Sequence, residues 1–385
     1  MNKYERIVFG SLFVFVFVFW WYNEGTYVRW LTTGIFCATL FSYYIARLTN
    51  WGYGALNLIV TCNALSLIYW RDNIYATYPW LDRSLFSASS GASCVSCYLI
   101  VCGVLGANHL GGSDVWKQIQ KLLGWLCVGN SILSVFQFFW HFSEHRVFSA
   151  GAFFGNPSVN GSFTAIVLPF WLAQADTKWK KWLCVFPIAS ILLSRASIPL
   201  GAFIIMALCY YFSMLANQKA RLFFRHIASL GLLIAAVWVA GYFWMQNHDD
   251  LETKNQLFDG SGRYEVWKAV WIYFKSYPHK LIGTGLGSSS ILLPYIQEKA
   301  GIIKNGHYFI WHHSDIYQIF FELGIVGFLL SIVAIAKTIL KSSNRPALLS
   351  ACVTYAFTMT INFPLHVPFQ AMLAGILIGS VYFAD

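Results

Sequence analysis

Long apolar stretches separated by short polar segments dominate the hydropathy pattern of this chain of 385 residues. Each stretch is about as long as a helix that crosses the ~30 Å hydrocarbon layer of a membrane, and there are about twelve of them. The pattern therefore predicts an all-α polytopic membrane protein with spans at residues 7–22, 28–47, 52–70, 91–107, 119–140, 160–175, 182–194, 198–216, 226–245, 314–337, 346–361 and 367–383. The sixth and seventh spans are short, so we expect one of them to be broken or re-entrant.

A long polar segment interrupts this pattern between the ninth and tenth spans. It divides the chain into three parts: residues 1–245 with spans one to nine, residues 246–313 as one large loop, and residues 314–385 with spans ten to twelve. Loops of this length are usually functional. Inside the loop, residues 263–277 have the spacing of an amphipathic helix, with an apolar face of Trp267, Val270, Trp271 and Phe274. We expect this helix to lie along the membrane surface or to cap a cavity.

The composition supports a membrane protein and excludes several other classes. Hydrophobic residues make up 57% of the chain and charged residues only 11%, against about 25% charged in ordinary soluble domains. A soluble enzyme, a disordered chain and a disulfide-framed secreted domain are excluded. The net charge of +10 comes from cations scattered between apolar stretches, so it predicts no nucleic-acid partner. Cys94 and Cys97 lie in an apolar run without a second pair, so no metal site is predicted.

The distribution of Lys and Arg predicts the orientation of the spans. With a cytoplasmic N-terminus, the inner segments contain fourteen of the 26 cations, the short outer segments contain five, and the long loop contains seven. Cytoplasmic segments are generally rich in Lys and Arg, whereas long loops translocate largely regardless of charge. We therefore expect both termini in the cytoplasm, residues 7–22 retained as the first span, and the long loop outside.

Polar side chains that could bind a substrate or transfer a proton gather on the predicted outer face. They are Arg195, Arg263, His312, His313, His366 and Asn156. Arg offers a permanent forked donor for phosphate oxygens, and His accepts a proton near neutral pH. Together they predict an outer cavity that holds a lipid diphosphate and activates a hydroxyl group. The alternative is a purely structural role, in which each Arg anchors a span at the lipid surface and each His is a hydrogen-bonded structural residue.

Two further features bear on this site. Glu322 is the clear carboxylate inside a predicted span, two turns into the tenth, and carboxylates inside spans are functional candidates. The glycine-rich run GTGLGSSS at residues 283–290 resembles a phosphate loop. It lacks the preceding strand of a βαβ unit, so a nucleotide-binding site is not predicted.

Four motifs, taken in order, resemble the bacterial O-antigen ligase and polymerase superfamily, which includes the O-oligosaccharyltransferases. They are GNPSVNGSFTAIVLP at 155–169, LLSRASIPLGAF at 192–203, GRYEVWKAVW followed by KLIGTGLG in the long loop, and HSDIYQIFFELGIVGFLL at 313–330. The closing segment PLHVPFQAMLAGILIG also fits, and the resemblance extends over about residues 151–380. Ser158, Ala196 and Ser314 depart from the family pattern, but no Arg or His of the motifs is lost.

The resemblance implies a GT-C-like, inverting glycosyltransferase that needs no metal or cofactor. It would move a glycan from an undecaprenyl-diphosphate carrier to an acceptor hydroxyl at the periplasmic face of the bacterial inner membrane. By motif, His313 corresponds to the general base, while Arg263 and Arg195 correspond to ligands of the diphosphate leaving group. His312 replaces His313 if the register is shifted by one, and substrate-binding roles are expected for His312, Glu322, Asn156 and His366.

Several functions share these motifs. An O-antigen ligase acting on lipid A–core is favoured, with an O-antigen polymerase or a protein O-oligosaccharyltransferase as alternatives. The partners are then the lipid-linked donor, a lipid A–core, glycan or protein acceptor, and membrane lipids. A lipid-linked glycan flippase is the alternative from another class. It predicts two related halves and polar residues at mid-membrane, and the sequence shows neither.

Overall fold

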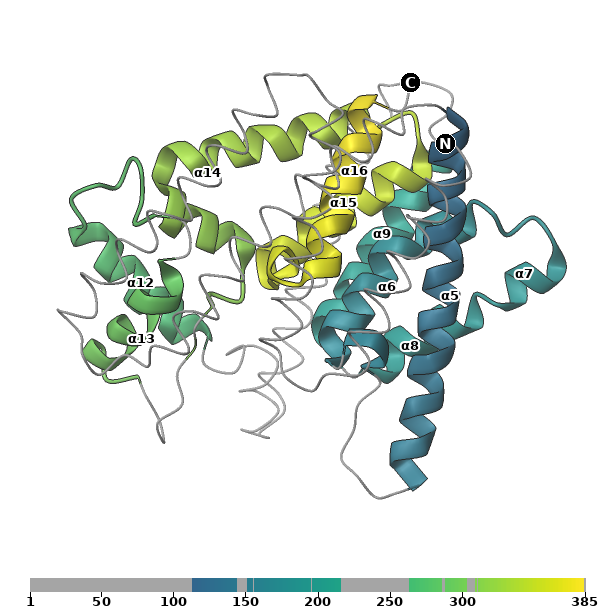
Figure 1. Ribbon diagram of the computed structural model, residues 1–385, viewed down its shortest axis with the longest axis horizontal. Helices are drawn as coiled ribbons and strands as arrows, with labels where there is room; N and C mark the ends of the chain where they lie inside the picture. Colours follow the sequence, from purple (N-terminus) through teal and green to yellow (C-terminus); the bar gives the residue numbers. More distant parts are fainter. Residues whose placement is uncertain are drawn as a thin grey trace, which may run out of the picture. The chain divides into compact units, whose positions relative to one another are not determined.

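The computed structural model describes residues 113–143, 151–154, 156–194, 196–215, 263–285, 288–302, 309 and 311–383. Within these ranges every regular element is a helix and no strand occurs (Figure 1). The predicted all-α class is therefore confirmed for this part of the chain. The predicted spans 7–22, 28–47, 52–70, 91–107 and 226–245 lie outside the described residues, so the total of about twelve spans stays a prediction.

Three helices in the described ranges are long and apolar enough to cross a membrane. They cover Lys117–Trp140, Ser197–Met214 and Asp315–Lys341, and they coincide with the predicted spans 119–140, 198–216 and 314–337. Two shorter apolar helices, Pro346–Ile361 and Phe369–Val381, occupy the positions of the last two predicted spans. The outer location of the long loop stays a prediction.

One compact unit of the chain contains a small bundle of apolar helices. Its members are α5 (Ser113–Ser143), the short η1 (Ala152–Phe154), α6 (Pro157–Leu172), α7 (Lys178–Trp182), α8 (Val185–Leu193) and α9 (Ser197–Leu215). The helix α6 is buried on all sides from Val159 to Trp171, and α5, α8 and α9 pack against it. This enclosure also covers the polar side chains of Asn160, Ser162 and Thr164, which are fully buried and need partners within the protein.

The predicted seventh span, 182–194, is interrupted. A turn at Leu183 and Cys184 separates the five residues of α7 from the nine residues of α8. Nine helical residues extend only about 14 Å, which is less than half of the hydrocarbon layer. The continuous helix in the predicted seventh span is thus the nine-residue α8, and α7 lies almost entirely before that span; that one of the two short spans is broken or re-entrant stays a prediction.

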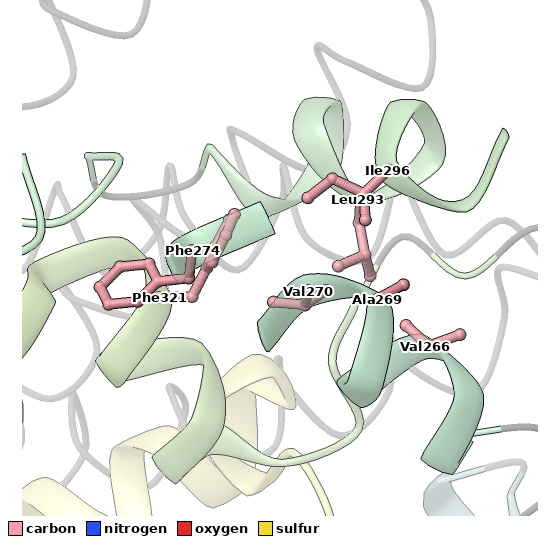
Figure 2. Packing of buried hydrophobic residues seen from close by; sticks show 7 residues of the cluster. All are labelled: Val266, Ala269, Val270, Phe274, Leu293, Ile296 and Phe321. Carbon is pink, nitrogen blue, oxygen red and sulfur yellow. The ribbon is translucent and has the colours of Figure 1, made fainter. Parts of the chain in front are cut away.

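The other compact unit contains the predicted loop helix and the segments that follow it. It includes α12 (Arg263–Ser276), α13 (Ser289–Lys299), most of α14 (Asp315–Lys341), the end of α15 (Pro346–Ile361), η3 (Pro364–His366) and nearly all of α16 (Pro368–Phe383). Its core joins α12, α13 and the first part of α14. The buried side chains are Val266, Ala269, Val270, Phe274, Leu293, Ile296 and Phe321 (Figure 2).

The amphipathic helix predicted at 263–277 is confirmed as α12, but its buried face is displaced from the predicted one. Val266, Val270 and Phe274 follow one another at intervals of four residues and form the buried stripe. Val270 and Phe274 were predicted correctly. Trp271 lies at the flank of this stripe and is 45% exposed, and the expectation that this side of the helix lies along the membrane surface or caps a cavity stays a prediction.

Candidate functional site

The two histidines of the WHHSD segment are anchored beside α12 by hydrogen bonds. The Trp267 indole N–H donates to the His312 carbonyl oxygen at 2.6 Å. The Tyr317 hydroxyl donates to the Trp267 carbonyl oxygen at 2.7 Å, and the rings of Trp267 and Tyr317 stack at 5.9 Å. These contacts fix the turn that precedes α14 against the first half of α12.

His312 and His313 are adjacent in sequence but have different surroundings. His312 is 1% exposed, its Nε2 lies 3.0 Å from Ser289 Oγ, and its ring packs on Tyr317 and Phe321. His313 has a φ of +53°, in the left-handed region that residues with a Cβ rarely adopt. Such strain persists only where the surroundings enforce it, and it is enriched at functional sites.

The His313 ring lies between two aromatic edges. Its centroid is 5.1 Å from Phe309 and 4.9 Å from Phe363, and both contacts are edge-to-face. Its Nδ1 is buried and has no hydrogen-bond partner in the described part of the chain. Buried polar atoms without a partner are rare and call for an explanation. A substrate group is one such explanation.

Arg263, the first residue of α12, also has a buried polar atom without a hydrogen-bond partner among the described residues. Its Nη1 donates to the Ile361 carbonyl oxygen at 3.5 Å, whereas its Nε is buried without a partner among the described residues. Burial lowers the pKa of Arg263, but a guanidinium keeps its charge in proteins. Arg263 is therefore a partly buried cation with donor capacity to spare.

The electrostatics of this region keep both adjacent histidines neutral. Burial, followed by the charges of Arg263 and His366, lowers the pKa of His313 to about 3. Burial, followed by His366 and His313, lowers the pKa of His312 to about 3. A neutral imidazole has a free lone pair, which a proton acceptor requires.

His366 has a carboxylate partner that the sequence did not reveal. Asp315 Oδ1 lies 2.8 Å from His366 Nδ1, and Asp315 Oδ2 accepts the Leu365 amide at 2.7 Å. The Asp315 amide in turn donates to the Asn362 carbonyl oxygen at 3.1 Å. Burial lowers the pKa of His366, but the hydrogen bond and the charge of Asp315 outweigh it and raise the pKa above its ordinary value. This geometry directs the Nδ1 proton to Asp315 and leaves Nε2 for a further contact.

Glu322 is buried between α13 and α14. Its Oε1 accepts the Gln318 side-chain amide at 2.8 Å and the Ser289 backbone amide at 3.3 Å. Ser289 is the first residue of α13, where a carboxylate interacts favourably with the free amides and the helix dipole. Glu322 and His312 therefore both contact Ser289: Glu322 through the Ser289 amide and His312 through the Ser289 hydroxyl.

The glycine-rich run packs directly against a break in α14. Gly324 has φ +68° and ψ −168°, which interrupts the helix, and Gly283 opposite it has φ +75°. The amides of Thr284 and Gly285 donate to the carbonyl oxygens of Phe321 and Glu322 at 3.1 and 2.8 Å. These amides are already used by the protein, which supports the expectation that this run is not a phosphate loop.

The structure brings together five of the seven residues that the sequence singled out. Arg263, His312, His313, Glu322 and His366 all belong to the unit that contains α12 and α13. Sequence reasoning missed Asp315, Ser289 and Trp267 as their partners. Asp315 lies two residues after His313, but nothing local in the sequence connects it to His366.

The other two residues lie elsewhere. The placement of Arg195 is outside the described residues. Asn156 caps α6, where its side-chain oxygen accepts the amides of Ser158 and Val159 at 2.9 and 3.2 Å. The substrate roles of Arg195 and Asn156 stay predictions.

Within the described residues, no group of three or more His, Cys, Asp or Glu side chains is arranged to hold a metal ion.

Comparison with known protein families gives a match to part of the chain. A family model described as O-antigen ligase matches residues 182–332, a range that contains Arg195, Arg263, His312, His313 and Glu322. No curated protein matches the chain. The match confirms the resemblance found in the motifs over residues 182–332, which are similar to the O-antigen ligase family model.

Proposed function

We propose that this protein is an inner-membrane glycosyltransferase of the O-antigen ligase type. It moves a glycan from an undecaprenyl-diphosphate carrier to an acceptor hydroxyl at the periplasmic face, with lipid A–core as the favoured acceptor. The observation that carries the proposal is the pair formed by Arg263 and His313. Each has a buried polar atom without a partner among the described residues, and both lie inside the matched family domain.

In this proposal the acceptor oxygen attacks the anomeric carbon of the donor sugar. The bond from that carbon to the diphosphate oxygen breaks, and attack from the opposite side inverts the anomeric centre. A ring nitrogen of His313 takes the hydroxyl proton as the general base of the step. The diphosphate leaves with the electron pair of the broken bond.

Arg263 stabilises the negative charge that grows on the diphosphate during this step. A preorganised donor in a partly buried site is worth more than the same donor in water. Arg195 is the second diphosphate ligand by its motif. His366, held by Asp315 at 2.8 Å and with a raised pKa, supplies a further donor. No metal ion takes part in the proposed step.

The remaining residues have supporting roles. His312 and Glu322 converge on Ser289, and they orient the α13 start and the turn that carries His313. Since His312 is bonded to Ser289 and 1% exposed, we assign the proton transfer to His313 and not to its neighbour. Asn156 is assigned a substrate-binding role because it lies in the first of the motifs that resemble the family.

Reconstituted transfer tests this proposal. Proteoliposomes containing the full chain are supplied with a labelled undecaprenyl-diphosphate glycan and with lipid A–core. Transfer of label to lipid A–core is expected with or without EDTA, and transfer should fall by about 10²-fold or more in His313→Ala and in Arg263→Ala. Wild-type rates in both variants would overturn the assignment, and loss in EDTA that Mg²⁺ restores would contradict the metal-free step.

The same preparation separates the alternatives. Extension of the donor's own glycan in the absence of lipid A–core identifies a polymerase. Label on a protein Ser or Thr identifies an oligosaccharyltransferase. A flippase moves the labelled lipid between leaflets without forming a new glycosidic bond.

A further inference from the structure

The helix α14 consists of two parts with different character. Residues 315–323 contain the buried polar side chains Asp315, Gln318 and Glu322. Residues 325–341 are almost entirely apolar, with exposed Val326, Leu329, Leu330, Val333 and Leu340. The second part extends about 26 Å at 1.5 Å per residue, which is close to the ~30 Å of the hydrocarbon layer. Figure 1 shows α14 bending between the two parts.

Backbone hydrogen bonds join the bend to the loop 280–285 in both directions. The amides of Ile325 and Val326 donate to the carbonyl oxygens of Lys280 and Leu281 at 3.0 and 3.1 Å. In the other direction, two loop amides donate to the carbonyl oxygens of Phe321 and Glu322. Irregular backbone is tolerated at membrane depth only where it is paired in this way.

This pairing places two large aliphatic side chains beside the start of the apolar part. Leu281 is 63% exposed and Ile282 is 70% exposed. They adjoin Ile325 and Val326, which are 37% and 49% exposed. These four residues, which we call the junction surface, continue the exposed apolar face of α14 onto the loop. A contiguous apolar surface of this kind indicates an interaction site.

Charged and aromatic residues near the junction surface indicate which partner covers it. On α12, Trp271 and Ile272 are 45% and 60% exposed, and Lys275 Nζ lies 5.5 Å from the Trp271 ring. Lys280 at the loop is also exposed. Exposed Trp and Lys beside aliphatic side chains are typical of the boundary between acyl chains and anionic headgroups.

We infer that the loop 280–285 is inserted into the membrane surface, so that Leu281 and Ile282 contact phospholipid acyl chains beside residues 325–341. Lys275 and Lys280 then lie at the level of the phosphate groups. Gly324 marks the membrane boundary on α14, and the first part of α14 stands outside the hydrocarbon with the polar cluster around His313. This inference concerns a lipid contact and holds whether or not the protein transfers a glycan.

Photo-crosslinking tests the contact directly. Benzoylphenylalanine is incorporated at position 281 or 282 of the full chain, and the protein is placed in nanodiscs of phosphatidylethanolamine and phosphatidylglycerol. Position 333, exposed on the second part of α14, is the positive control. Position 299, an exposed Lys at the end of α13, is the negative control. After irradiation, intact-mass spectrometry identifies the adducts.

The expected result is a phospholipid adduct at 281, 282 and 333, and none at 299. An adduct at 333 without one at either 281 or 282 would place the loop in water and overturn the inference. A protein–protein adduct at 281 and 282 would also overturn it, because a second copy of the chain would then cover the junction surface. Two neighbouring positions are used so that one variant that fails to fold leaves the other as the test.

Discussion

The close approach of two glycines predicts a large effect for Gly283→Ala. An added Cβ at Gly283 would lie 2.6 Å from the carbonyl carbon of Glu322 and closer still to the amide nitrogen of Gly324. Because these are backbone atoms, no change of rotamer relieves the overlap. The loop 280–285 and the break in α14 would have to separate.

Two terms contribute to the expected loss of stability. The φ of +75° at Gly283 costs a residue with a Cβ about 1–2 kcal/mol. Separation weakens the backbone hydrogen bonds between the loop and α14, and losing two of them costs roughly 1–3 kcal/mol more. The total is about 2–5 kcal/mol.

Gly301→Ala provides a matched control. Gly301 also has a positive φ, +66°, but an added Cβ there would meet nothing within 4 Å. This variant should therefore carry only the conformational cost of about 1–2 kcal/mol. The difference between the two variants isolates the close packing at Gly283.

The assay is the apparent midpoint of thermal unfolding for the detergent-solubilised chain, followed by size-exclusion chromatography after heating. Gly283→Ala should lower the midpoint by at least about 1.5 times as much as Gly301→Ala. Equal shifts in the two variants would refute the reasoning, because the contact between Gly283 and Gly324 would then contribute nothing beyond the backbone conformation.

Further predictions concern the polar cluster. His313→Ala should lower the transfer rate by about 10²–10⁴-fold and leave the unfolding midpoint unchanged; a midpoint that falls with the rate would indicate a structural role. His312→Ala should lower the midpoint instead, because a buried Ser289 hydroxyl without its partner costs about 1–3 kcal/mol; an unchanged midpoint would contradict this. Arg263→Lys should reduce transfer while retaining the charge, since the forked donor is lost, and wild-type kinetics in this variant would count against a forked contact. The pKa of His366 is raised in the folded protein, so its protonated form stabilises the fold. This stabilisation is complete at a pH below the pKa of His366 in the unfolded chain, about 6.5, and it is lost as the pH rises through the pKa in the folded protein. Unfolding midpoints measured from pH 6 to pH 9 should therefore decline less in His366→Gln than in the wild type, and parallel curves would contradict the paired state of His366.

Local patterns in the chain predicted much of the fold. The 3.6-residue spacing of apolar positions predicted α12, because a helix buries one face irrespective of what covers it. The lengths of the apolar stretches predicted the helices at 119–140, 198–216 and 314–337, because each stretch is about as long as a helix that crosses the hydrocarbon layer. The buried stripe of α12 is centred on Val266, Val270 and Phe274, one position to the side of Trp267 and Trp271, since periodicity leaves the centre of an apolar face uncertain by one position.

The candidate site was predictable by residue type but not by arrangement. The motifs around Arg263 and His313 are contiguous in sequence, and the family match covers both of them. The pairing of His366 with Asp315 joins residues 51 positions apart, so no local signal announces it. The same holds for Gly283 and Gly324, whose shared need for a positive φ and for close contact is visible only when the loop meets the helix.

The sequence by itself determined the helical, strongly apolar character of the chain and the Arg and His residue types of the candidate site, because hydropathy, charge and helical spacing are properties of neighbouring residues. Only the tertiary structure decided which of two adjacent histidines is available. His312 turns into the core toward Ser289, whereas the left-handed backbone of His313 directs its ring between Phe309 and Phe363. The physical reason is that two identical side chains differ only in their surroundings, and those surroundings come from α13, α14 and the turn before α16.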